Sequence, residues 1–180
     1  MEMGRETMKS NTDHDLGKKR VIIRSPWHDN PIDYITNIEV PKFQSKFTER
    51  LAISSINTEV TRKLARLFFQ HDLKLVVFSA AWCKDCQIVI PVLAKLYQMT
   101  KIPMKILGDV KVNQSGMPQW HVPPSPPEIN ELAVVKVPAI IILDDNNNEL
   151  ARIYEQPPEG YTLEQHMFKL LTGILEQGES

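Results

Sequence analysis

Apolar residues recur along the chain with two different periods, and the changes of period mark out the expected elements. Over residues 58–70 they fall three or four apart between Lys and Arg, which predicts a helix that Asn57 or the first residue of that range can cap. Residues 73–78 form a short β-branched and aromatic run, typical of a strand buried on both faces. The helical period returns over residues 83–100, where Pro91 should kink the helix.

The second half of the chain continues this alternation. A strand is expected at residues 104–107, and strand, helix and strand at this spacing form a crossover that makes the two strands parallel. Two further runs, 138–143 and 150–154, flank turn-forming residues and should pair as a hairpin. A last helix follows, opened by Thr162 and Gln165 in capping-box spacing.

A long loop, residues 109–124, separates the second strand from the hairpin and contains Trp120 and His121. A loop this long in a compact domain is often functional, so a substrate-covering role is open. We expect instead that Trp120 packs against the N-terminal extension and that His121 is solvated, with tuning of a thiolate as its alternative. Residues 125–128 have the pattern of a capping box with proline at the first helical position, which predicts a short helix through Leu132.

The first third of the chain has a weaker pattern. Residues 1–20 lack an apolar period and are expected to be a disordered tail. Residues 21–55 hold short apolar clusters interrupted by prolines, and we interpret them as an N-terminal extension packed on the domain. The regular alternation fills residues 56–180, which we expect to form one α/β domain.

Composition and charge exclude several classes of protein. A length of 180 residues fits one domain with an extension. Lys and Arg number 21 against 22 Asp and Glu, and the resulting net charge of −1 argues against a nucleic-acid binder. No stretch reaches the roughly 18 apolar residues of a membrane span, and the N-terminus lacks the apolar region of a signal peptide. We therefore expect a cytoplasmic protein without a membrane partner.

Only two cysteines occur, Cys83 and Cys86, at the expected start of a helix. A secreted scaffold would hold several pairs closing longer loops, so this pair indicates chemistry. Thiol–disulfide exchange needs a thiolate, which a helix N-terminus stabilises. We therefore expect Cys83 to attack a disulfide and the more buried Cys86 to resolve the mixed disulfide. Lys84 should favour the thiolate and Asp85 should oppose it, so the redox poise is open.

A closely spaced cysteine pair can also be half of a zinc site, or two small buried side chains. A zinc site needs further ligands, commonly also closely spaced, and the chain has no second cysteine pair. Its five histidines are scattered, at His14, His28, His71, His121 and His166. We expect no metal and no cofactor besides a redox-active disulfide between Cys83 and Cys86.

The residues around the cysteines resemble the thioredoxin superfamily. Residues 79–91 read Ser-Ala-Ala-Trp-Cys-Lys-Asp-Cys-Gln-Ile-Val-Ile-Pro, similar to the family's strand, active-site turn and kinked helix. Val137-Pro138 is similar to the family's hydrophobic residue and cis-proline that face the cysteines just before a strand. The resemblance covers roughly residues 57–177. It implies a thioredoxin fold, a central mixed β-sheet flanked by helices, here with an N-terminal extension.

The resemblance also implies roles for individual residues. Trp82 would shape the exposed face beside Cys83, and the Val137 backbone would pair with an extended substrate segment next to Pro138. The ordinary alternatives are a core tryptophan and a strand-opening proline. The buried carboxylate that many family members carry before the active site falls at Val77, so we expect that proton relay to be absent.

The sequence thus predicts a thioredoxin-like disulfide reductase that uses Cys83 and Cys86 as a dithiol–disulfide pair. Its partners would be a disulfide-bearing protein or small molecule, and an external thiol or flavin-dependent reductase as electron donor. Lys84-Asp85 stands where thioredoxin has Gly-Pro, which leaves the substrate range open. The alternatives are a redox-sensing or protein-interaction module without reductase turnover, and a peroxide-reducing or metal-delivery protein.

Overall fold

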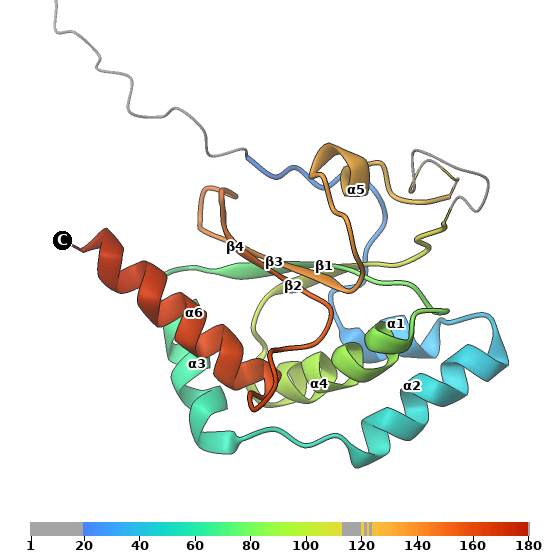
Figure 1. Ribbon diagram of the computed structural model, residues 1–180, viewed down its shortest axis with the longest axis horizontal. Coiled ribbons are helices and arrows are strands. Elements are labelled where there is room, and N and C mark those ends of the chain that lie inside the picture. Colours follow the sequence, from blue (N-terminus) through green and yellow to red (C-terminus); the bar gives the residue numbers. More distant parts are fainter. Residues whose placement is uncertain (1–19, 113–119, 121, 123, 180) are drawn as a thin grey trace, which may run out of the picture.

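The computed structural model describes residues 20–112, 120, 122 and 124–179. A four-stranded sheet in the order β2-β1-β3-β4 forms its centre (Figure 1). The strands are β1 (Lys74–Phe78), β2 (Met104–Leu107), β3 (Ala139–Leu143) and β4 (Glu149–Tyr154). β1 pairs in parallel with β2 and antiparallel with β3, and β3 pairs antiparallel with β4. This mixed sheet confirms the predicted fold class and the predicted hairpin.

Helices surround this sheet, and all but one of them begin where the sequence predicts. They are α3 (Thr58–Gln70), α4 (Lys84–Thr100), the short α5 (Glu128–Glu131) and α6 (Leu163–Gly178). The Asn57 side chain accepts a hydrogen bond from the backbone N–H of Val60, and Thr162 and Gln165 form a complete capping box. Figure 1 shows α3, α4 and α6 below the sheet and α5 above it.

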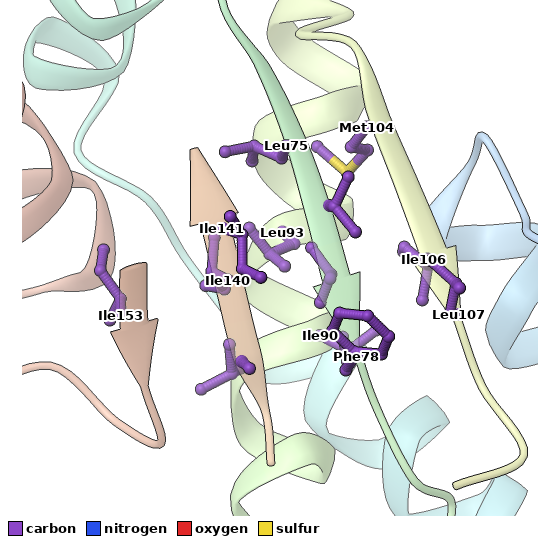
Figure 2. Close-up of a cluster of buried hydrophobic side chains, with 14 of the residues drawn as sticks. Leu75, Phe78, Ile90, Leu93, Met104, Ile106, Leu107, Ile140, Ile141 and Ile153 are labelled. Atoms are coloured by element: carbon purple, nitrogen blue, oxygen red, sulfur yellow. The ribbon is translucent and has the colours of Figure 1, made fainter. Parts of the chain in front are cut away.

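The core lies between the sheet and α4. Figure 2 shows buried apolar side chains from all four strands together with Ile90 and Leu93 of α4. Its labelled members are at most 4% exposed: Leu75, Phe78, Ile90, Leu93, Met104, Ile106, Leu107, Ile140, Ile141 and Ile153. Because this face of α4 is held against the sheet, the N-terminus of α4 is fixed just beyond the carboxyl end of β1.

None of the helices described is long and apolar enough to span a membrane.

Two helices form in the N-terminal extension, where the sequence pattern indicated only apolar clusters. These are α1 (Pro31–Thr36) and α2 (Pro41–Ile53), and both lie against α4. The two prolines stand at the first positions of the helices, where the missing N–H has no intrahelical partner to lose. Phe47 of α2 is completely buried.

The chain ahead of α1 is tied to the sheet at two places. The backbone N–H of Val21 donates to the carbonyl of Asn147 in the turn between β3 and β4, at 2.8 Å. His28 and Ile106 of β2 exchange two backbone hydrogen bonds, each 2.9 Å long. The extension therefore forms an isolated bridge with β2, the edge strand of the sheet.

The capping box expected at residues 125–128 is wrong. Pro127 occupies the N-cap position of α5 and makes no side-chain cap. The Glu128 carboxylate instead accepts hydrogen bonds from Ser25 Oγ at 2.6 Å, from Arg24 N at 2.7 Å and from Ser25 N at 2.8 Å. Three donors from the extension therefore bind this carboxylate.

The loop after β2 is described only in part, and His121 lies outside the described residues. Trp120 is 5% exposed, and its Nε1 donates to the carbonyl of Val134 at 2.6 Å. The Asn130 amide in α5 also reaches the Trp120 carbonyl, at 3.5 Å. These hydrogen bonds attach Trp120 to α5 and the segment after it, whereas we expected it to pack against the N-terminal extension.

Candidate active site

Cys83 is the N-cap residue of α4. Its Sγ accepts a hydrogen bond from the backbone N–H of Cys86 at 3.2 Å, in the place where a Ser or Asp oxygen usually caps a helix. Both cysteines are free thiols. Cys83 keeps 8% of its surface exposed and Cys86 none. A substrate can therefore reach the first sulfur, while the second is enclosed one turn into the helix.

The two thiols differ in acidity. A hydrogen bond from the Cys86 thiol is the main cause that lowers the pKa of Cys83, and it acts with the N–H groups of Cys86 and Asp85 against the effect of burial. Burial is the main cause that raises the pKa of Cys86, and its hydrogen bond to Cys83 adds to this. The shared proton therefore stays on Cys86, and Cys83 is the stronger nucleophile of the two.

Val137 and Pro138 lie opposite the Cys83 sulfur. The peptide bond between them is cis. The protonated Cys83 thiol donates to the Val137 carbonyl at 3.4 Å. Cys83 and Val137 are thus in contact although they lie 54 positions apart in the sequence.

Trp82 is held beside Cys83 with 39% of its surface exposed. Its Nε1 donates to the Val110 carbonyl at 2.9 Å, which orients the indole. A cavity of about 310 Å³ lies next to this ring, and the extension supplies part of its wall through Trp27 and His28. This Trp is therefore a partly exposed wall of the site rather than a core side chain.

The two residues between the cysteines are less buried than the cysteines themselves. Lys84 is exposed, and the half-buried Asp85 accepts a hydrogen bond from the Gln156 amide at 2.7 Å. The negative charge of Asp85 acts to raise the pKa of Cys83, as expected from its sign, although its backbone N–H acts in the opposite direction.

A pair of hydroxyl groups lies under the site, and the sequence analysis missed both. Val77 is completely buried and apolar, whereas Ser79, just after β1, is a completely buried hydroxyl that acts to lower the pKa of Cys86. The Ser79 Oγ also lies 3.0 Å from the hydroxyl of Tyr34 in α1. Ser79 belongs to the recognised motif, but no sequence signal connects it with Tyr34.

Metal ligands do not cluster here. Throughout the part of the chain that the structure describes, no group of three or more His, Cys, Asp and Glu residues could hold a metal ion.

A family model described as thioredoxin matches residues 42–167 of the chain. This span contains both cysteines and the cis-proline, and it begins inside α2. No curated protein sequence matches the chain significantly.

Two solved structures share the fold at low sequence identity. A protein of unknown function from Pseudomonas aeruginosa is 18% identical, with a TM-score of 0.56, over 83% of this chain and 93% of its own. An HIV epitope scaffold has the same identity and coverage and a TM-score of 0.55. Thioredoxin f2 from Chlamydomonas reinhardtii is 21% identical, with a TM-score of 0.37, over 60% of this chain and 81% of its own.

Proposed function

This chain belongs to the thioredoxin family, and from that premise we propose that it is a disulfide reductase that works through Cys83 and Cys86. The observation that carries the proposal is the asymmetry of the two thiols. One is accessible, caps a helix and has a lowered pKa, and the other is buried and has a raised pKa. Attack followed by resolution needs this division of roles.

The reaction would proceed in two exchanges. The Cys83 thiolate attacks one sulfur of a substrate disulfide and forms a mixed disulfide, and the other substrate sulfur leaves as a thiolate and takes up a proton. Cys86 then loses its proton and attacks the Cys83 sulfur, which releases the second substrate thiol. Two electrons pass to the substrate, and Cys83 and Cys86 end as a disulfide. An external thiol or flavin-dependent reductase would restore the dithiol.

Val137 and Trp82 would bind the substrate beside the reacting sulfur. The Val137 backbone lies next to Cys83, so an extended segment that carries the target disulfide can pair with it as an added strand. The exposed part of Trp82 offers an apolar surface on the same face. This arrangement suits a protein or peptide disulfide, with small disulfides as alternative substrates.

Reduction of insulin with dithiothreitol as electron donor tests the proposal. The wild type should accelerate the reaction, Cys83→Ser should abolish the acceleration, and Cys86→Ser should accumulate a mixed disulfide that is visible by mass spectrometry. Ser45→Ala, which alters an exposed side chain on α2, should behave as wild type.

Two results would contradict the reductase assignment. One is acceleration that survives Cys83→Ser. The other is a wild type that forms the mixed disulfide without turnover, which would favour the redox-sensing or protein-interaction alternative.

A further inference from the structure

The hydroxyl pair under the active site joins the N-terminal extension to the buried thiol. Tyr34 is 6% exposed and Ser79 is completely buried, and their oxygens lie 3.0 Å apart. The Ser79 hydroxyl acts to lower the pKa of Cys86, and the Cys86 sulfur accepts the backbone N–H of Ala80, the residue after Ser79, at 3.5 Å. A row of polar groups therefore runs from Tyr34 in α1 through Ser79 to the surroundings of the resolving thiol.

The resolving step creates the need for such a row. Cys86 must become a thiolate in a site without solvent, and its burial opposes the charge. Val77, where a carboxylate would otherwise assist, is apolar. Donors that already point at the sulfur lower the cost of the charge without any rearrangement during the reaction.

We propose that Ser79 donates a hydrogen bond to the Cys86 thiolate during the resolving step, and that Tyr34 is the positioning residue that orients Ser79. The proposal rests on the proposed function, because it concerns the second of the two exchanges. It also gives the extension a part in the chemistry, since α1 supplies the Tyr34 hydroxyl.

The direction of the hydrogen bonds follows from what each group can donate. A serine hydroxyl has one proton, so it donates to sulfur only if its other neighbour donates to it. Burial is the main cause that raises the pKa of Tyr34, so this phenol keeps its proton and serves as the donor to Ser79. The proton that Cys86 loses ends on the departing substrate sulfur. The charge on Cys86 disappears when its bond to Cys83 forms.

The Tyr34 ring is fixed on several sides. Phe47 of α2 and His28 meet it edge to face, with ring centroids 5.9 Å and 5.8 Å away. Gly108 lies against its other edge, and a Cβ at that position would come within 2.7 Å of Tyr34 Cε2. Only glycine leaves room for the ring here, so the hydroxyl is held close to Ser79.

Several titratable groups surround this row and contribute to its pH dependence. The charges of Cys83, Cys86 and Asp109 act on Tyr34, and that of Asp85 acts on Cys83. His28 touches the Tyr34 ring. The test therefore follows the resolving step over a range of pH and compares variants at each value.

A chromophoric aromatic disulfide separates the two exchanges in one stopped-flow trace, because attack and resolution each release one coloured thiolate. Ser79→Ala should slow the second release about tenfold, as expected for losing one hydrogen bond to a charged group, and should move its pH profile upward. Tyr34→Phe should slow the same phase by a smaller factor. The first release should change less than about twofold in both variants.

The controls are a conservative replacement and the loss of a phenol oxygen that is not part of the hydroxyl pair. Ser79→Thr keeps the hydroxyl and should restore much of the second rate. Tyr154→Phe removes a phenol oxygen that accepts a hydrogen bond from Arg152 on β4, and should leave both phases unchanged. If Ser79→Ala does not fold, Tyr34→Phe and Ser79→Thr decide the question.

An unchanged second phase in Ser79→Ala and Tyr34→Phe would overturn the role of the hydroxyl pair. Equal slowing of both phases would also overturn it, because it would show general damage to the site. A wild type without a first phase would instead contradict the proposed function itself.

Discussion

At the scale of single residues, the sulfur of Cys83 combines two tasks. It completes the first turn of α4 by accepting the N–H of Cys86, and it faces the Val137 carbonyl. A sulfur that caps a helix feels the dipole of the whole helix as well as the nearest N–H groups. The position of the cysteine one residue before the helix therefore contributes directly to its acidity.

The charge of Asp85 offers a test of this acidity. Asp85→Asn should lower the pKa of Cys83 further, because it removes a negative charge that disfavours the thiolate. The new amide keeps an oxygen that can accept from Gln156, so the local structure should persist. Titration of the thiolate by its ultraviolet absorbance measures the change.

Asp145→Asn is the matched control, because it removes the same charge from the exposed turn between β3 and β4. It should leave the Cys83 titration unaltered. A Cys83 pKa that rises or stays constant in Asp85→Asn would show that the carboxylate does not oppose the thiolate.

At the scale of elements, the local sequence pattern predicted the strands and most of the helices from Asn57 onward. The strands and the helices α3, α4 and α6 are found within a residue or two of their predicted bounds, because each has a clear period, a cap or a buried run. The helices of the extension were missed for a physical reason. α1 is short, and prolines taken as interruptions are the first residues of α1 and α2.

In the candidate site, too, the arrangement of residues close together in the sequence was predictable, whereas a contact between distant residues was not. Cys83, Cys86 and Trp82 are neighbours in sequence, so a motif predicts their arrangement, and Val137-Pro138 was placed through the family resemblance. The contact between Tyr34 and Ser79 joins residues 45 positions apart through side chains alone. Neither hydrophobic period nor spacing encodes such a contact, so only the folded chain reveals it.

Glu128 gives a prediction about how the elements are held together. Burial alone would raise its pKa, but hydrogen bonds from Ser25 and Arg24 together outweigh this and lower it. A carboxylate with a lowered folded-state pKa stabilises the protein above its unfolded pKa, and this stability is lost as the pH falls through the folded pKa. Glu128→Ala should reduce the free energy of unfolding by about 1.5–3 kcal/mol at neutral pH.

Denaturant unfolding at several pH values measures this effect. The difference between wild type and Glu128→Ala should shrink as the pH falls through the lowered pKa of Glu128, where the wild-type carboxylate becomes protonated. Glu159→Gln removes an exposed carboxylate and should change little at any pH. A constant difference across the pH range would mean that the charge of Glu128 is not what holds the extension.

At the scale of the whole molecule, the extension shares the core of the domain. Phe47 is completely buried, and α2 lies against α4. The family model begins at residue 42, so Tyr34 lies outside the matched span. The Pseudomonas aeruginosa structure matches 83% of this chain, a longer stretch than residues 56–180, so the shared fold takes in part of the extension.

Phe47→Ala should therefore destabilise the entire protein. Removal of a completely buried aromatic side chain lowers the free energy of unfolding by about 3–5 kcal/mol. Because the extension and the domain share one core, all elements should lose this stability together. Differential scanning calorimetry should show one transition at a clearly lower Tm. Phe69→Ala is the matched control on α3, where the side chain is 53% exposed, and should shift the Tm far less. An extension that melts separately, before an unchanged main transition, would contradict the shared core.

The bridge between His28 and Ile106 has a consequence outside the folded monomer. β2 is an edge strand, and edge strands carry backbone donors and acceptors that can pair with a strand of another molecule. The extension occupies both hydrogen-bonding groups of Ile106, near the middle of this short strand. A second chain therefore cannot add to this edge in continuous register, and the same segment that brings Tyr34 toward the active site protects the protein from self-association through the β2 edge of its sheet.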